Sequence, residues 1–214
     1  MRKHITLFLT VVAALLLTAC GGEKSVEVGP YTLTVIDPNV YHIQDYNASY
    51  PAGEYFDEEG NLTHFNNCSD IYLIVGDEAA LLIDLSNKIN WADNADASLK
   101  QLVAERIGDK PLTITFTHNH GDHLGMLPAF LEDDVHFALP RNDFGALAER
   151  FPQNKYSFFG EGHLFELGGA KVEAIAVPGH TAGSMVFYLH GRNLLFTGDA
   201  IGSGHGVWIF NQDA

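Results

Sequence analysis

The chain has 214 residues, of which 46% are hydrophobic, and 27 Asp and Glu outnumber 12 Lys and Arg for a formal net charge of −15. This length and composition can bury one sizeable core, and no repeat or low-complexity segment appears. The acidic balance argues against a nucleic-acid substrate, because phosphate backbones are held by Lys and Arg.

The first residues resemble a bacterial lipoprotein signal. A basic pair, Arg2-Lys3, precedes the apolar stretch Ile5–Leu17, which is too short to span a bilayer of about 30 Å comfortably. The stretch ends in Leu17-Thr18-Ala19-Cys20, an order typical of a lipidated cysteine. We therefore expect a signal peptide over 1–19, a lipidated tether over 20–30, and a membrane-anchored, extracytoplasmic protein of the bacterial cell envelope. A plain signal peptide or an uncleaved anchor helix is the alternative.

The next part of the chain predicts four strands and one helix. With Cys20 assigned to lipid, Cys68 is the only other cysteine, which excludes a disulfide framework and is expected to be a small buried hydrophobe. The segment Tyr46–Asn67 is predicted as an extended insertion. A helix is predicted over Asp93–Ile107, with Gly108 past its end. The strands are predicted near Tyr31–Ile36, Val40–Ile43, Ile71–Val75 and Ala80–Leu85.

The run Thr115–His123 concentrates metal ligands at the end of a predicted strand. The strand is Leu112–Thr117, and it leads into His118, His120, Asp122 and His123. Neutral imidazoles and carboxylates bind zinc at about 2.0–2.2 Å, and folding alone does not require this density of them. A solvated His-rich loop with incidental metal affinity is the less favoured alternative.

Two later loops also follow apolar strands and supply further ligands. His180 lies in the turn-rich segment after Pro178-Gly179, and Asp199 follows Gly198 at the end of the strand near Asn193–Thr197. Repeated strand–turn–ligand units indicate an α/β scaffold that presents its chemistry at one edge of a sheet. Helices are predicted over Leu124–Leu131 and Asp143–Arg150, and strands near Val135–Leu139, His163–Leu167, Lys171–Val177 and Ser184–Leu189.

The order H-x-H-x-D-H, P-G-H-T-x-G-S and T-G-D resembles the metallo-β-lactamase superfamily of metallohydrolases. The resemblance implies that His118, His120 and His180 bind one metal ion, that Asp122 and His123 bind a second, and that Asp199 bridges them. It also implies that Asp84, at the end of Leu81-Leu82-Ile83, supports the metal loop without binding metal. From the sequence alone, a simple strand-ending turn at Asp84 is equally acceptable.

The implied fold is of the α/β class, a four-layer αβ/βα sandwich whose second half is truncated. The family places a further histidine well beyond the bridging aspartate, but the sequence ends at Ala214 and its only later histidine, His205, follows too soon. We therefore expect 31–214 to be a metallo-β-lactamase-like domain that is incomplete at its C-terminus. If it is complete, the second metal site lacks one ligand and is weak.

The ligand set and the resemblance together predict a zinc-dependent hydrolase. Two divalent ions about 3.5–4 Å apart can share a hydroxide, polarise a carbonyl and stabilise a leaving group. Asp122 would orient that metal-bound hydroxide or accept its proton. His123 and the bridging Asp199 resemble the thioesterase, lactonase and phosphoesterase branches more than the β-lactam-cleaving ones. No G-x-S-x-G motif supports covalent catalysis.

The leading prediction is therefore a binuclear Zn²⁺ enzyme that hydrolyses a small ester, thioester, lactone or related bond in a small-molecule substrate. Three alternatives stay open. One is an oxidoreductase of the same fold that binds a single iron through the three histidines and Asp199 and oxidises a persulfide. The others are a β-lactam hydrolase and a non-catalytic metal-binding lipoprotein. Metal content distinguishes the iron enzyme from the zinc hydrolase.

Overall fold

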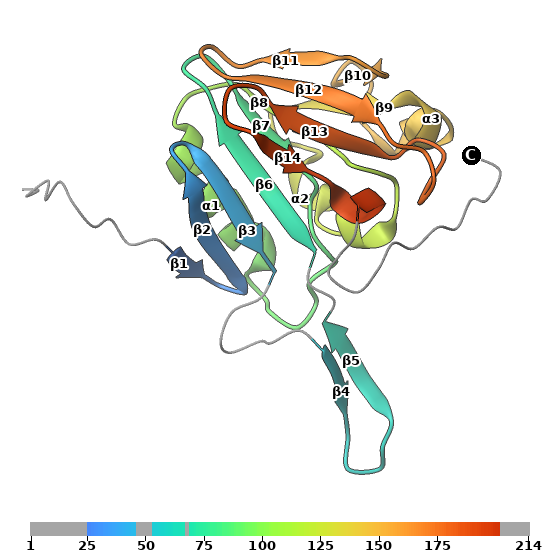
Figure 1. Cartoon of the computed structure of the whole chain (residues 1–214). Helices are drawn as coiled ribbons and strands as arrows, with labels where there is room; N and C mark the ends of the chain where they lie inside the picture. Colours follow the sequence, from blue (N-terminus) through green and yellow to red (C-terminus); the bar gives the residue numbers. More distant parts are fainter. Residues whose placement is uncertain (1–24, 46–52, 67–68, 202–214) are drawn as a thin grey trace, which may run out of the picture.

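The computed structural model describes residues 25–45, 53–66 and 69–201, which form two β-sheets packed face to face, a separate two-stranded hairpin and several helices (Figure 1). The predicted signal peptide with Cys20, Cys68, and the tail beyond Ile201 with His205 lie outside the described residues. Among the described residues, no helix is both long and apolar enough to cross a membrane.

The larger sheet has eight strands in the order β1-β2-β3-β6-β7-β8-β9-β10. The pairs from β1 to β7 are antiparallel, whereas β7, β8, β9 and β10 run parallel to one another. Since parallel strands end at the same edge, the segments that follow β7, β8 and β9 lie together. The strands are β1 Ser25–Val28, β2 Tyr31–Asp37, β3 Val40–Gln44, β6 Asp70–Val75, β7 Ala80–Ile83, β8 Leu112–Thr115, β9 His136–Pro140 and β10 Tyr156–Phe159.

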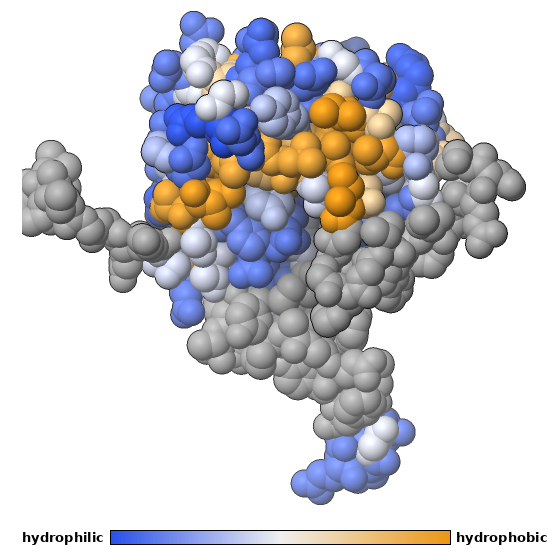
Figure 2. All heavy atoms as spheres, viewed as in Figure 1, coloured by the Kyte–Doolittle hydropathy of each residue, from blue (hydrophilic) through white to orange (hydrophobic). Residues whose placement is uncertain are grey.

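The smaller sheet is an antiparallel meander of four strands in the order β11-β12-β13-β14. Its strands are β11 Leu164–Glu166, β12 Lys171–Ala176, β13 Met185–Leu189 and β14 Leu194–Phe196. Figure 2 shows apolar residues gathered in a band across this face of the molecule, and Leu195 of β14 is 45% exposed.

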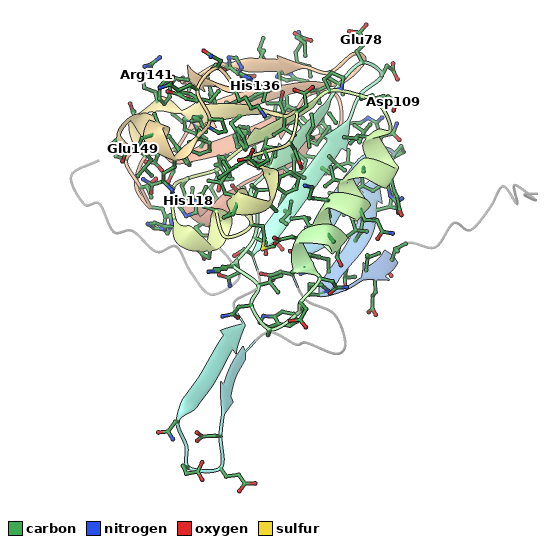
Figure 3. The ribbon with its side chains drawn as sticks, turned by 180° about the vertical axis from the view of Figure 1, so that it is seen from behind. Glu78, Asp109, His118, His136, Arg141 and Glu149 are labelled. Carbon is green, nitrogen blue, oxygen red and sulfur yellow. The ribbon has the colours of Figure 1, made fainter. Side chains whose placement is uncertain are left out.

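Two apolar cores result from this layering. One lies between the sheets, where Ile74 and Leu81 of the larger sheet join Val172 and Phe187 of the smaller one. The other lies on the opposite face of the larger sheet, which α1, Ala95–Ile107, covers (Figure 3). The described residues thus form a helical layer and two sheets of the expected α/β sandwich.

Helix α1 confirms the predicted apolar face. Leu99, Leu102, Val103 and Ile107 are all buried, as their spacing of three and four residues predicted. The helix begins two residues later than predicted and ends at the predicted residue, before Gly108. The predicted helix Leu124–Leu131 is present only as the short α2, Leu127–Phe130.

The predicted helix Asp143–Arg150 is wrong in its bounds and in its type. The structure has a short α-helix, α3, over Arg141–Phe144, followed by a 3₁₀ helix, η2, over Gly145–Arg150. The turn begins directly after Pro140, whose ring suits the start of a helix. This earlier start places Asp143 inside α3, at the edge where β8 and β9 end.

The structure has four strands that were not predicted, namely β1, β10 and the two strands of a hairpin. The tether predicted over 20–30 is wrong from Ser25 onward, because β1 pairs with β2. The insertion Tyr46–Asn67 contains a two-stranded hairpin of β4 Gly53–Phe56 and β5 Leu62–Asn66, which projects from the body of the molecule (Figure 1).

Candidate metal centre

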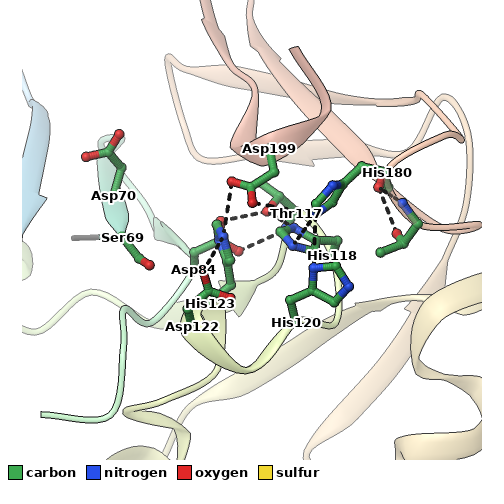
Figure 4. A network of polar contacts seen from close by, with 12 residues as sticks. Ser69, Asp70, Asp84, Thr117, His118, His120, Asp122, His123, His180 and Asp199 are labelled. Atoms are coloured by element: carbon green, nitrogen blue, oxygen red, sulfur yellow. Dashed lines mark hydrogen bonds and ion pairs between the residues drawn. The ribbon is translucent and has the colours of Figure 1, made fainter. Parts of the chain in front are cut away.

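The predicted ligand loops converge where strands of both sheets end. The first loop follows β8 of the larger sheet, His180 follows β12, and Asp199 follows β14 of the smaller sheet, in the 3₁₀ helix η3 Gly198–Ile201. A backbone hydrogen bond from Met185 N to Thr117 O, 2.8 Å long, joins the two sheets beside these loops. Figure 4 shows the ligand side chains pointing toward one another.

Three histidines form the first group. His180 Nε2 lies 3.1 Å from His118 Nε2 and 2.9 Å from His120 Nδ1. The three rings stand edge-on to one another, with each pair of centroids 4.6 Å apart. Ligand atoms about 2.0–2.1 Å from a tetrahedral zinc ion lie about 3.3–3.4 Å apart, so the two nitrogen–nitrogen separations need to widen only slightly to place the nitrogens around one ion.

The second group is His118, His123 and Asp199, whose ligand atoms lie within 4.8 Å of one another. Asp199 faces both groups, because its Oδ1 is 3.3 Å from His123 Nε2 and its Oδ2 is 3.5 Å from His180 Nε2. A carboxylate with one oxygen toward each group is the arrangement expected of a bridging ligand.

Asp122 lies beside the second group and is not one of its close members. Its Oδ2 is 3.9 Å from His123 Nε2, and the side chain is 30% exposed. His118 takes part in this second group as well as in the first. His118 is therefore common to both groups, which sequence reasoning did not anticipate.

Asp84 is buried beneath the metal loop, and its carboxylate accepts three hydrogen bonds. The donors are Thr117 N at 2.7 Å, Thr117 Oγ1 at 2.7 Å and His123 Nδ1 at 2.9 Å. Asp84 also adopts a left-handed backbone with φ of 62°, which ends β7 one residue earlier. Asp84 thus both contacts the metal loop and forms the turn that ends β7.

These contacts determine which ring nitrogens carry protons. A carboxylate only accepts, so His123 Nδ1 carries a proton toward Asp84, and the ring presents Nε2 to Asp199. The Thr117 hydroxyl donates to Asp84 and therefore accepts from His118 Nδ1, 3.0 Å away. His118 Nε2 is thus unprotonated and faces the three-histidine group, as a metal ligand requires.

The electrostatics differ between the two groups. Burial and, to a lesser extent, the nearby His123 lower the pKa of His118 to about 2. Burial also lowers the pKa of His120. For His123, burial favours a lower pKa, but the charge of Asp84 and the hydrogen bonds that the ring donates to Asp199 and Asp84 outweigh it and raise the pKa well above 6.5. The hydrogen bond from His123 lowers the pKa of Asp199 to about 2.

Two supporting residues were missed by sequence reasoning, Thr117 and Asp143. Thr117 belongs to the ligand motif, but its hydroxyl was not assigned a role. Asp143 lies 24 to 40 residues from its partners Asn119, Thr181 and Gly183, so no local spacing marks it. Its one signal is its position after β9, the parallel neighbour of β8.

The other histidines whose side chains the structure describes have partners elsewhere. His42 contacts Asp70, His136 contacts Ser157, His190 contacts Glu173, and His163 packs on aromatic rings. No other cluster of three ligand side chains occurs in the described part of the chain.

Comparisons with known proteins identify a family and several relatives. A family described as the Metallo-beta-lactamase superfamily matches residues 69–211. An atrochrysone carboxyl ACP thioesterase of Emericella nidulans is 33% identical over 141 residues, covering 65% of this chain and 42% of its own. A thioesterase of the same name from Aspergillus chevalieri is 32% identical over 142 residues, which cover 66% of this chain and 42% of the relative. The chain thus spans about two-fifths of the length of these curated relatives.

Solved structures share the fold at low sequence identity. A flavoprotein from Thermotoga maritima superposes with a TM-score of 0.58 at 22% identity, covering 81% of this chain and 42% of its own. A metallo-beta-lactamase from Pontibacter korlensis gives 0.55 at 22% identity, covering 77% and 69%.

Proposed function

The chain belongs to the metallo-beta-lactamase superfamily, and from this we propose that it is a metal-dependent hydrolase acting on a small thioester or related ester. The observation that carries the proposal is the convergence of four histidines with one carboxylate that faces both groups. The names of the fungal relatives favour a thioester over other acyl bonds.

We propose Zn²⁺ as the metal, with two ions per chain. His118, His120 and His180 would hold one ion, and His123 with Asp199 would hold the other. Bound there, zinc would supply Lewis-acid activation of water and of the scissile carbonyl near neutral pH.

The chain's own side chains would prepare this chemistry. Asp84 and Thr117 keep the protons of His123 and His118 on the ring nitrogens that face away from the ligand groups. We assign Asp122, beside His123, the role of accepting the proton of the attacking water. Asp199 would hold the two groups in position relative to each other, because one of its carboxylate oxygens faces each group.

Metal analysis and turnover test the proposal on the same sample. We expect zinc in the purified protein, held more tightly by the three-histidine group, and thiol release from an acyl-N-acetylcysteamine thioester. His190→Gln is the matched control, because this histidine pairs with Glu173 away from the metal centre. One iron with oxygen uptake on persulfide would favour the oxidoreductase, and opening of a chromogenic cephalosporin would favour the β-lactam hydrolase. Metal without any turnover would favour the binding protein.

We further propose that the protein is anchored by lipid at Cys20 in the bacterial cell envelope and acts on a small molecule, not on nucleic acid. The signal-like order of residues 1–20 and the net charge of −15 support this. Two or more acyl chains on Cys20 would give lasting attachment. Mass spectrometry of the mature N-terminus tests it: Cys20→Ser should lose the lipid, and an unmodified Cys20 in the parent protein contradicts the proposal.

A further inference from the structure

A buried carboxylate outside every predicted site lies between the two loops of the three-histidine group. Asp143, in α3, is 7% exposed. Its Oδ2 accepts hydrogen bonds from Asn119 N at 3.1 Å and from Thr181 Oγ1 at 2.7 Å. Its Oδ1 accepts from Gly183 N at 2.6 Å. Both oxygens are therefore used, and all three donors belong to the ligand loops.

These donors are the chain neighbours of the ligands. Asn119 separates His118 from His120, and its side-chain amide also donates to the Asp143 carbonyl at 3.0 Å. Thr181 directly follows His180. One carboxylate thus holds the loop after β8 of the larger sheet and the loop between β12 and β13 of the smaller sheet.

The loop carrying His180 is built to receive this carboxylate. The Thr181 hydroxyl donates to Asp143, so the Ser184 hydroxyl, 2.7 Å away, must donate to Thr181 Oγ1. Ser184 Oγ in turn accepts from Thr181 N at 3.0 Å. A Cβ at Gly183 would lie 2.5 Å from Asp143 N, so only glycine permits this approach.

We propose that Asp143 is a positioning residue that brings His180 to His118 and His120, so that the three nitrogens converge on one metal ion. The proposal deepens the function proposed above, since it requires that this group binds metal. Hydrogen bonds to a charged acceptor are roughly twice as strong as neutral ones, and bonds to main-chain N–H groups hold loop position directly. Loss of such a support typically weakens metal binding about 10–100-fold.

The test measures zinc affinity in a background of His123→Ala, which leaves only the three-histidine group with Asp199. Asp143→Asn replaces one acceptor oxygen by a donor that faces the N–H of Gly183 or of Asn119. Thr181→Val removes one donor from the other side of the contact, and Thr181→Ser retains it. Asp134→Asn is the control, because this exposed carboxylate lies just before β9.

Competition with a chromophoric chelator should show zinc affinity about tenfold or more lower in Asp143→Asn and Thr181→Val, and unchanged in Thr181→Ser and Asp134→Asn. The visible absorption of bound Co²⁺ should lose its tetrahedral intensity in the first two. A merely structural role would lower the melting temperature of the metal-free protein and leave affinity and spectrum unchanged, which overturns the proposal.

If Asp143→Asn does not fold, the pair Thr181→Val and Thr181→Ser decides, and equal affinity in the two overturns the proposal. A parent protein that binds zinc without hydrolysing thioesters contradicts the proposed function and leaves this inference standing. A parent that binds no zinc overturns both.

Discussion

The two halves of the metal centre are the three-histidine group and the group of His123 and Asp199. Each is supported by a buried carboxylate, but the two carboxylates contact different parts of the ligand loops. Asp143 contacts two main-chain N–H groups and one hydroxyl, and it touches no imidazole in its hydrogen bonds to the loops. Asp84 binds the ring of His123 directly and reaches His118 through Thr117. Asp143 therefore controls where the ligands lie, whereas Asp84 controls their protons. Substitutions that alter either the position of the ligands or their protonation can test these two roles.

The largest expected effect comes from the ligand that both halves share. His118→Ala removes the ligand that lies near both groups and should lower zinc binding most, whereas His120→Ala and His180→Ala affect only the first group. We expect zinc affinity at least 100-fold lower in His118→Ala and 10–100-fold lower at one site in the others, by analogy with the cost of losing even a supporting residue (about 10–100-fold). Elemental analysis after dialysis measures this. Full stoichiometry in all three variants would rule out the ligand assignment.

The next effect concerns Asp84. Asp84→Asn leaves shape unchanged but removes the charge that pairs with His123 in a buried site, so the metal-free protein should lose about 3 kcal/mol of unfolding free energy. Zinc affinity of the second group should also fall. Chemical denaturation and zinc titration measure the two effects, with the exposed Asp134→Asn as control. Stability equal to that of the parent would show that the buried pair is not formed.

The pH dependence separates the halves without changing a ligand. Zinc must displace the proton of His123, whose pKa is raised, so affinity at the second group should fall about tenfold per pH unit below that pKa. The pKa values of His118 and His120 are lowered, so these two ligands should add little to the pH dependence of the first group near neutrality. In Asp84→Asn the pKa of His123 drops. The pH range over which the zinc affinity of the second group falls should therefore move to lower pH. Parallel pH profiles for the two groups would contradict these two roles.

The same shift predicts the pH response of the metal-free protein. Because the folded pKa of His123 lies above the unfolded value of about 6.5, its contribution to stability is complete below that value and is lost as pH rises through the folded pKa. The lowered pKa of His118 acts oppositely, since the unfolded chain binds its proton as pH falls below about 6.5. Denaturation of His123→Ala and His118→Ala against pH separates the two contributions.

The smallest effect is expected far from both halves. His190→Gln removes an ion pair whose histidine is 41% exposed, and such surface pairs contribute about 0–1 kcal/mol. Zinc stoichiometry and thioester turnover should equal those of the parent. A loss of metal in this variant would show that reduced zinc content does not report on the ligand groups.

Sequence reasoning succeeded where the signal is local. The three histidines and the aspartate of the first loop lie within six residues, and the apolar face of α1 repeats every three to four residues. It failed where the signal is distant in the chain. Asp143 meets Gly183 across 40 residues, and the shared role of His118 depends on how two sheets dock. Short elements such as β1 and β10 depend on pairing partners, which no local pattern reveals.

The candidate ligands come from both sheets, which has a consequence for folding. Residues 118, 120 and 123 follow β8, but residues 180 and 199 belong to the smaller sheet, so an ion can be captured only after the two sheets have met. Metal loading would then be a late event that locks an interface already formed by Leu81, Val172 and Phe187. An ion present at 100 times its dissociation constant adds about 2.7 kcal/mol to the folded state. Removing the ion with a chelator would loosen the core between the two sheets and leave the core between α1 and the larger sheet intact.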